Sequence, residues 1–213
     1  LLEPIELIVP SGSLLHPNFH LDESSQPGVA GGNVELSQRL TDLILSSVFK
    51  VAACSQGTMN NLSFGNDHFS HYETLGGGAG ACVGCKGTSA VQVHMTNTAI
   101  TDPEIMESRF PVQLLSHRIR KGSGGSGTWY GGDGVEREYE FQEKTTFSFL
   151  TQRRKLGPEG LEGGSAGLPG EQILFQKGGE KTKLPGSCTA IANPGDRLIV
   201  RTPGGCLLYT SPS

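Results

Sequence analysis

Two consecutive segments of this chain place their bulky residues at every second position, which is the pattern of half-buried β-strands. In the segment 135–141, Val, Arg, Tyr and Phe alternate with three glutamates, and in 145–149 Thr, Phe and Phe alternate with Thr and Ser. The segments 173–176 and 198–201 have the same strand-like character. The second half of the chain is therefore expected to be rich in β-structure.

Glycine is unusually frequent and is gathered into clusters. The chain contains 31 glycines in 213 residues, which is about double the usual ~7%. The clusters lie at 76–80, 122–134 and 157–170, with strand-like segments between them. This arrangement favours tight turns and close approaches of the backbone in a folded domain over flexible linkers.

The first half contains one strong helical pattern, at 33–50. Its apolar residues recur near helical spacing, so we expect an amphipathic helix whose leucine face packs into the core. These residues are Val34, Leu36, Leu40, Leu43, Ile44 and Val48. Together the patterns predict an α+β fold of mixed character, with a helix-containing first half (1–110) and a β-rich, glycine-rich second half (111–205).

Composition and cysteine usage exclude several classes of function. A net charge of -4 gives no electrostatic footprint for nucleic acid or an anionic membrane, and no apolar run approaches the ~20 residues that span a bilayer. Five cysteines without a secretory pattern predict a reducing, cytoplasmic setting. Cys82 and Cys85 form a CxxC motif, but a structural zinc site needs four ligands and no second pair has suitable spacing. A redox or zinc module stays open as a lesser alternative.

The densest polar segment is HMTNT at 94–98, which is followed by TDPEIMESRFP at 101–111. Asp102 and Pro103 have the features of an N-cap and a first helical position, so Glu104 and Glu107 would share one face of a short helix. The segment then has two interpretations. It is either part of a functional site, or a capped helix and a turn whose polar side chains satisfy the local backbone.

A set of motifs spread in order along the chain favours the first interpretation. They are GGNVELSQ at 31–38, SQGTMNN at 55–61, YETLGGGAGA at 72–81, HMTNT at 94–98, SGGSG at 123–127, GGDGVERE at 131–138, GLEGG at 160–164, PGDRL at 194–198 and TPGG at 202–205. With them the chain resembles the hydantoinase B/oxoprolinase family, and within it the carboxyl-terminal part of the ATP-dependent 5-oxoprolinases. The tail CLLYTSPS at 206–213 departs from the family's pattern and is expected to be non-native or aberrant.

The resemblance implies a fragment of a larger hydrolase that acts on carbon–nitrogen bonds in cyclic amides. The reaction would open 5-oxoproline to glutamate with ATP and water, and this chain would contribute to the ring-opening half. ATP with Mg would be bound by an actin-like, hydantoinase A-type domain or subunit outside this chain, and the family's metal ligands lie in an amino-terminal part that is also missing. We therefore assign no metal ligand here, and expect the fragment to be inactive alone and the whole enzyme to be oligomeric.

The resemblance also implies roles for particular residues. A carboxylate base, a proton shuttle, contacts to the ring amide and its oxyanion, and an arginine fork for the substrate carboxylate are the groups that such a reaction needs. The expected catalytic residues are His94, Asp102 and Glu104. The expected substrate-binding residues are Tyr72, Glu73, Thr96, Asn97, Arg109 and Arg153, with the glycines at 76–80 beside them.

Three alternatives stay open at this point. The same motifs occur in hydantoinase B subunits, which hydrolyse hydantoins, and in large subunits of the acetone carboxylase type. A different class is a noncatalytic scaffold that packs on an ATP-handling partner. The scaffold would be favoured if His94, Asn97 and Asp102 proved to be scattered over the surface.

Overall fold

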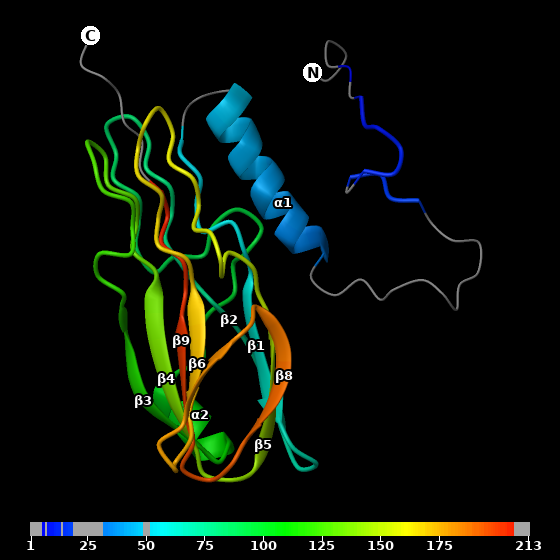
Figure 1. The fold of residues 1–213 in the computed structure, drawn as a ribbon, viewed down its shortest axis with the longest axis vertical. Helices are drawn as coiled ribbons and strands as arrows, with labels where there is room; N and C mark the ends of the chain where they lie inside the picture. Colours follow the sequence, from blue (N-terminus) through cyan, green and yellow to red (C-terminus); the bar gives the residue numbers. More distant parts are fainter. Residues whose placement is uncertain (1–5, 7, 14, 19–31, 49–51, 207–213) are drawn as a thin grey trace.

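The computed structural model describes residues 6, 8–13, 15–18, 32–48 and 52–206, and within them two antiparallel sheets pack face to face as a sandwich. The first sheet has the order β2-β1-β5-β8 and the second has the order β3-β4-β9-β6-β7. In Figure 1 the strands occupy the lower part of the molecule, the glycine-rich segments extend above them, and helix α1 lies beside the upper part. The elements are α1 (Gly32–Leu43), the π-helical turn η2 (Ile44–Val48), β1 (Asn60–Gly65), β2 (Ser70–Leu75), α2 (Pro103–Arg109), β3 (Val112–Ile119), β4 (Val135–Phe141), β5 (Thr145–Leu150), β6 (Glu171–Phe175), β7 (Lys181–Leu184), β8 (Ser187–Ala192) and β9 (Arg197–Arg201).

The strands foreseen from period-two patterning are all present, and their inward residues form the core. Phe147 and Phe149 of β5 and Tyr139 and Phe141 of β4 are buried between the sheets, as the alternation predicts. Phe64 joins them from β1, with its ring centroid 5.8 Å from that of Phe141. Both helices lie in the first half, as expected, but the described chain is mostly β, because 60–75 also forms a hairpin that pairs with β5.

The glycine clusters form a layer in which extended segments contact one another through their backbones. We call residues 76–81, 123–134 and 203–206 the glycine layer. Gly78 N donates to Pro203 O, Gly132 N to Ala79 O and Gly205 N to Gly132 O, at 3.1, 2.9 and 2.8 Å. These bonds confirm the expected close approaches. Neighbouring backbones come close enough to bond because glycine has no side chain to keep them apart.

Helix α1 is amphipathic as predicted, but its orientation is the reverse of the expected one. Leu43, Ile44 and Val48 are 56%, 38% and 69% exposed, and Val34, Leu36 and Leu40 are half-buried. The expectation that the leucine face enters the core is therefore wrong for Leu43 and Ile44. The α-helix also ends at Leu43 and continues as a π-helical turn to Val48, and residues 49–50 of the predicted helix lie outside the described part.

The exposure of this helix face predicts how two substitutions differ. We expect Leu43→Ala to change the free energy of unfolding of the 213-residue chain by less than about 0.5 kcal/mol, the usual scale for a surface position. Met106→Ala in α2 should cost about 2–5 kcal/mol, because Met106 is fully buried in the core and its truncation leaves a cavity. Urea unfolding of both variants measures the difference, and equal losses would place Leu43 in the core after all.

Candidate functional site

Helix α1 turns a polar face toward the rest of the protein. Glu35, Gln38, Asp42 and Ser46 recur at spacings of three and four residues, and each is less than a tenth exposed. Spacings of this kind place side chains on one side of a helix. Burying four polar groups is costly unless each finds a partner, so the contacts of this face indicate what it does.

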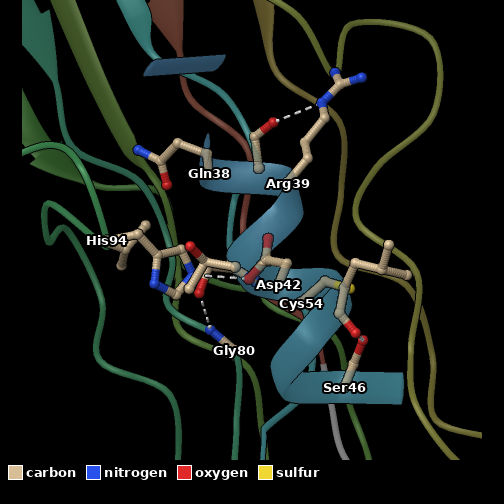
Figure 2. Close-up of polar contacts among 12 residues, drawn as sticks. Gln38, Arg39, Asp42, Ser46, Cys54, Gly80 and His94 are labelled. Carbon is tan, nitrogen blue, oxygen red and sulfur yellow. Dashed lines mark hydrogen bonds and ion pairs between the residues drawn. The ribbon is translucent and has the colours of Figure 1, made fainter. Parts of the chain in front are cut away.

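Asp42 is at the centre of this polar face and pairs with His94. Asp42 Oδ1 lies 2.9 Å from His94 Nε2 and also accepts a hydrogen bond from Ser55 N at 2.9 Å. The two side chains are 5% and 16% exposed. Figure 2 shows the His94 ring directed at Asp42, with Gln38, Arg39 and Ser46 on the same helix. Because a carboxylate only accepts hydrogen bonds, a neutral His94 donates its Nε2 proton to Asp42 and keeps Nδ1 as an acceptor.

Arg153 and Asp42 both lie beside Gly57. A Cβ added at Gly57 would be 3.2 Å from Arg153 Nε and 3.6 Å from Asp42 Oδ2, so the two charged groups flank the same glycine. Neither Arg153 Nε nor Asp42 Oδ2 has a hydrogen-bond partner among the described residues, although both atoms are buried. Buried polar atoms without partners in a native protein call for an explanation, such as a bound ligand or water.

The backbone around Asp42 is strained at two positions. His94 and Arg153 have φ values of 52° and 54°, a region that residues with a side chain rarely adopt. Such strain costs about 1–3 kcal/mol per residue and collects at functional sites. Two strained residues therefore contribute their side chains to the surroundings of one buried carboxylate.

A cavity of about 410 Å³ opens beside Asp42 and Arg153. Arg39 lines it as well, and burial followed by the nearby charge of Arg153 lowers the pKa of Arg39. Arg39 Nε donates to Gly57 O at 3.3 Å, and its Nη2 donates to Gln152. Two guanidinium groups and two carboxylates, those of Asp42 and Glu159, thus share a cavity large enough for a small polar molecule. The lining residues are Arg39, Asp42, Leu43, Ser46, Ser47, Cys54, Arg153, Glu159, Gly160 and Leu161.

The remaining polar groups of α1 hold the neighbouring loops. Glu35 accepts hydrogen bonds from Thr58 Oγ1 at 2.9 Å and Met59 N at 2.7 Å, and burial raises the pKa of its carboxyl. Gln38 Nε2 donates to Thr96 Oγ1 at 3.2 Å, and Thr96 closes the turn of its own loop by donating to Val93 O. These contacts position the segment that carries His94 against the helix.

Cys54 adds a thiol to the wall of the cavity. A hydrogen bond from the Cys206 thiol lowers the pKa of Cys54, with smaller contributions from Ser46 and Arg153 opposing its burial and the charge of Asp42. Cys206 is fully buried, and its backbone N–H donates to Cys54 O at 2.9 Å. Ala81 N of the glycine layer donates to Cys206 O at 3.0 Å. Residues 207–213 of the expected aberrant tail lie outside the described residues.

The structure brings together three of the residues expected from the sequence and separates them from the others. His94, Thr96 and Arg153 meet on the polar face of α1. Asn97, Glu104 and Arg109 are exposed, and no hydrogen bond among the described residues connects them to His94 or Asp42. Asp102 is the N-cap of α2, where its Oδ1 accepts from Glu104 N at 2.9 Å and Ile105 N at 3.3 Å. Their catalytic or binding roles remain predictions.

Glu73 and Tyr72 lie on β2, away from this cavity. Tyr72 is half exposed and donates its hydroxyl proton to Asn61 Oδ1 at 2.7 Å on the outer face of the first sheet. Glu73 is buried between the sheets, with its Oε1 3.3 Å from Arg137 Nε and accepting from the Tyr139 hydroxyl. Arg137 Nη2 in turn donates to Thr101 O at 3.0 Å. Glu73 therefore links the two sheets and helps to anchor the segment that follows HMTNT.

The Glu73 network predicts an acid-sensitive contribution to stability. Burial alone would raise the pKa of Glu73, but His71, whose Nε2 lies 3.7 Å from Glu73 Oε2, the charge of Arg137 and the Tyr139 hydroxyl together bring it below the ordinary value. A carboxyl whose folded pKa is lowered stabilises the fold above its unfolded pKa, and that stabilisation is lost as the pH falls through the folded pKa.

We expect Glu73→Gln to lower the free energy of unfolding by about 3–5 kcal/mol at neutral pH, because Arg137 is left buried without its counter-charge. The difference from wild type should shrink as the pH falls below the ordinary range of carboxyl groups. Urea unfolding at neutral and acid pH measures both effects, and Glu180→Gln, at an exposed carboxylate, is the matched control. A Glu73→Gln variant as stable as wild type at neutral pH would contradict this account.

The glycines at 76–80 adjoin the site but do not offer free amides to it. Gly77 N donates to Val91 O, Gly78 N to Pro203 O and Ala79 N to Thr88 O, while Gly80 N donates to Ser55 Oγ. The amides of residues 77–80 thus already have acceptors within the protein, while the expectation that the glycines at 76–80 line a substrate pocket stays a prediction. Gly80 contacts Ser55, whose own amide binds Asp42.

The sequence-based reasoning missed Asp42, Arg39 and Gly57. Asp42 and Arg39 lie inside the segment whose helical pattern was interpreted from its apolar residues alone, so its polar residues received no role. A usable signal was present in the series 35, 38, 42 and 46, in which every residue is polar and faces one side. Gly57 stands in the motif SQGTMNN, and its φ of 65° explains why a glycine is suited to that position.

The amino-acid sequence of this chain matches a known protein family and several known proteins. A model of the hydantoinase B/oxoprolinase family matches residues 1–206. 5-oxoprolinase 1 of Arabidopsis thaliana is 48% identical over 204 residues, which cover 96% of this chain and 16% of the plant protein. The 5-oxoprolinase of Dictyostelium discoideum is 45% identical over the same share of both chains. The chain thus spans about one sixth of the length of these relatives.

A solved structure supports the fold. The ATP-dependent caprolactamase from Pseudomonas jessenii superposes with a TM-score of 0.62 at 20% identity, over 78% of this chain and 31% of the other. At this identity the likeness establishes a shared fold. The superposed part makes up 31% of the caprolactamase chain, so the shared fold is one part of a larger protein there.

Proposed function

Because the chain belongs to the hydantoinase B/oxoprolinase family, we propose that it forms part of the ring-opening half of an ATP-dependent cyclic amide hydrolase, with 5-oxoproline as the substrate and glutamate as the product. The observation that carries the proposal is the contact between the buried Asp42 carboxylate and His94, beside a cavity lined by Arg39 and Arg153. This arrangement supplies the groups that hydrolysis of a carboxylated lactam requires. The relatives' names support the choice of substrate.

Proton transfer falls to the Asp42–His94 pair. Water that attacks the lactam carbon must lose a proton, and the ring nitrogen must gain one when the carbon–nitrogen bond breaks. Asp42 lines the cavity through a carboxylate whose Oδ2 lacks a partner among the described residues, and its Oδ1 binds His94. The pair can therefore take the proton from water and return it to the nitrogen, with the negative charge of Asp42 stabilising a protonated imidazole.

Arg153 and Arg39 can hold the carboxylate of the substrate. Both guanidinium groups line the cavity, and an anion between them would relieve the repulsion that contributes to the lowered pKa of Arg39. A guanidinium binds a carboxylate through two parallel hydrogen bonds. Thr96 and Asn97, the contacts of the ring amide expected from the sequence, are not among the residues that line this cavity.

The described residues do not fit ATP with Mg. The amides of the glycine segment 77–79 already donate to protein carbonyls, and no group of three or more His, Cys, Asp or Glu in the described part could hold a metal ion. We therefore assign ATP, magnesium and any further divalent metal to an actin-like domain or subunit and an amino-terminal part outside this chain. Neither helix of the described part has the length and apolar character needed to cross a bilayer.

The test of the proposal is coupled turnover by the full-length enzyme. We expect it to release ADP, phosphate and glutamate from 5-oxoproline in equal amounts, whereas the 213-residue chain alone should release none above a blank without enzyme. The physical reason is that the ATP-handling groups lie elsewhere. Glutamate release by the short chain, or a full-length enzyme that opens hydantoin but leaves 5-oxoproline intact, would overturn it; the latter result would favour a hydantoinase B subunit.

A noncatalytic scaffold is the second candidate. The separation of Asn97 and Asp102 from His94 favours it, since Asp102 already has a structural role as the cap of α2. In that case the Asp42–His94 pair would serve only to fix the helix, and its removal would affect stability without affecting turnover.

A further inference from the structure

The outward face of α1 and η2 carries a continuous apolar stripe. We define the apolar stripe as Leu36, Leu40, Leu43, Ile44 and Val48. The last three are 56%, 38% and 69% exposed, while the first two are half-buried. The opposite side of the same helix carries Glu35, Gln38, Asp42 and Ser46, all buried. A surface helix normally buries its apolar side and leaves its polar side in water, so this helix is turned the other way.

The polar contacts of α1 explain this orientation. Asp42 accepts from Ser55 N and pairs with His94, Glu35 accepts from Met59 N, and Gln38 donates to Thr96. Each of these bonds would be lost if the helix rotated to bury its leucines. The helix is therefore fixed by polar contacts on one side, and its apolar side is left for a second partner.

We infer that the apolar stripe packs against an apolar segment of the same polypeptide, in the part of the module that the relatives possess beyond this chain. The chain accounts for 16% of the plant 5-oxoprolinase and for 31% of the caprolactamase chain that shares its fold. Most of the family's structural unit thus lies outside these residues. The stripe contains no charged residue, so the chemistry of its partner is apolar.

The small size of the stripe favours a partner in the same chain over a second copy of the protein. A stable interface between separate molecules uses roughly 20–30 residues a side, and association must also offset the loss of translational and rotational freedom. A stripe of five side chains on one helix is far below that size. Within a single chain no such association cost arises, so a short apolar contact is sufficient.

A partner on the apolar stripe would also affect the site. Helix α1 would be held between two parts of the enzyme, with Asp42 directed at one and the apolar stripe at the other. Docking of the second part would then fix the position of Asp42 relative to His94 and Arg153. The cavity beside Asp42 would then reach its final shape only when the second part of the enzyme packs against α1.

Hydroxyl-radical footprinting of the full-length protein tests the inference without any substitution. We expect Ile44 and Val48, which are exposed and do not line the cavity, to be oxidised at least tenfold more slowly than in a synthetic peptide that comprises residues 32–48. Equal oxidation rates would overturn the inference. Protection that disappears when the protein is diluted to monomers would also overturn it, because it would identify a second copy as the partner.

Thiol labelling provides a second, independent measurement. Ile44→Cys and Val48→Cys in the full-length protein should react with a maleimide at least a hundredfold more slowly in the native state than in denaturant. Glu180→Cys, at an exposed position in the turn before β7, is the control and should react within about tenfold of its denatured rate. Labelling of the two stripe positions at the rate of the control would contradict the proposed contact, whatever the enzyme's activity proves to be.

Discussion

Gly78→Ala is expected to prevent stable folding, with a loss in the free energy of unfolding of about 5 kcal/mol or more, at the extreme end of single substitutions. A Cβ at Gly78 would stand well inside van der Waals distance of Gly132 O and Gly205 N. Both atoms belong to backbones that are hydrogen-bonded within the glycine layer, where Gly205 N donates to Gly132 O. Relief would require two segments to separate at once, so the overlap cannot be absorbed by a side-chain rotation.

The matched control is Gly178→Ala. Gly178 lies in the turn between β6 and β7, where an added Cβ would meet nothing within 4 Å. This change should alter the free energy of unfolding by less than about 0.5 kcal/mol, or stabilise slightly by restricting the unfolded chain. Urea unfolding followed by circular dichroism distinguishes the two variants. A Gly78→Ala variant that unfolds at the wild-type urea concentration would show that the glycine layer is loosely packed.

His94→Ala and Asp42→Asn in the full-length enzyme should each lower kcat by at least about a hundredfold, the usual scale for loss of a general acid–base group. His94→Ala removes the imidazole, and Asp42→Asn removes the charge that would stabilise its protonated form. The two effects should be far from additive in the double variant, because both residues act in one proton-transfer unit. Glutamate release at saturating 5-oxoproline and ATP is the measurement.

His68→Ala is the matched control for this experiment. His68 lies in the turn between β1 and β2, where its backbone amide donates to Asn66 Oδ1 at 2.9 Å, and its side chain does not line the cavity beside Asp42. Its removal should leave kcat within about twofold of wild type. Asp102→Asn belongs in the same series, because Asn also caps helices well; a hundredfold loss there would give Asp102 the chemical role expected from the sequence. Wild-type turnover in His94→Ala would favour the noncatalytic scaffold.

The sequence predicts the strands of this protein better than it predicts the site. Strands β4 and β5 follow directly from period-two patterning, because one side of each strand meets the core and the other does not. The close approaches of the glycine clusters also follow, since few other residues tolerate such contacts. The fold class is less well predicted, because the hairpin β1–β2 carries many small polar residues and gives a weak strand signal.

Helix α1 shows why the rest could not be predicted. The helical spacing of its apolar residues was interpreted correctly, but an apolar stripe indicates only that this side of the helix packs against a partner. It does not tell whether that partner lies in this part of the chain. The side that does face the sandwich is polar. Asp42 on that side is a candidate site residue because it contacts His94, which is 52 residues away in the sequence. A pairing of that kind depends on tertiary structure that local patterns do not contain.

The order β3-β4-β9-β6-β7 places the last strand of the described chain at the centre of its sheet. Strand β9 pairs with β4 on one side and with β6 on the other, so neither neighbouring hairpin can join the other until residues 197–201 are available. On a ribosome, the five-stranded sheet could not close before this segment had left the exit tunnel. The hairpins β3–β4 and β6–β7 would wait with unpaired edges, which are the surfaces most prone to aggregation. Synthesis of this protein therefore has a vulnerable interval, and a chaperone that shields strand edges should raise its yield more than one that acts on the finished chain.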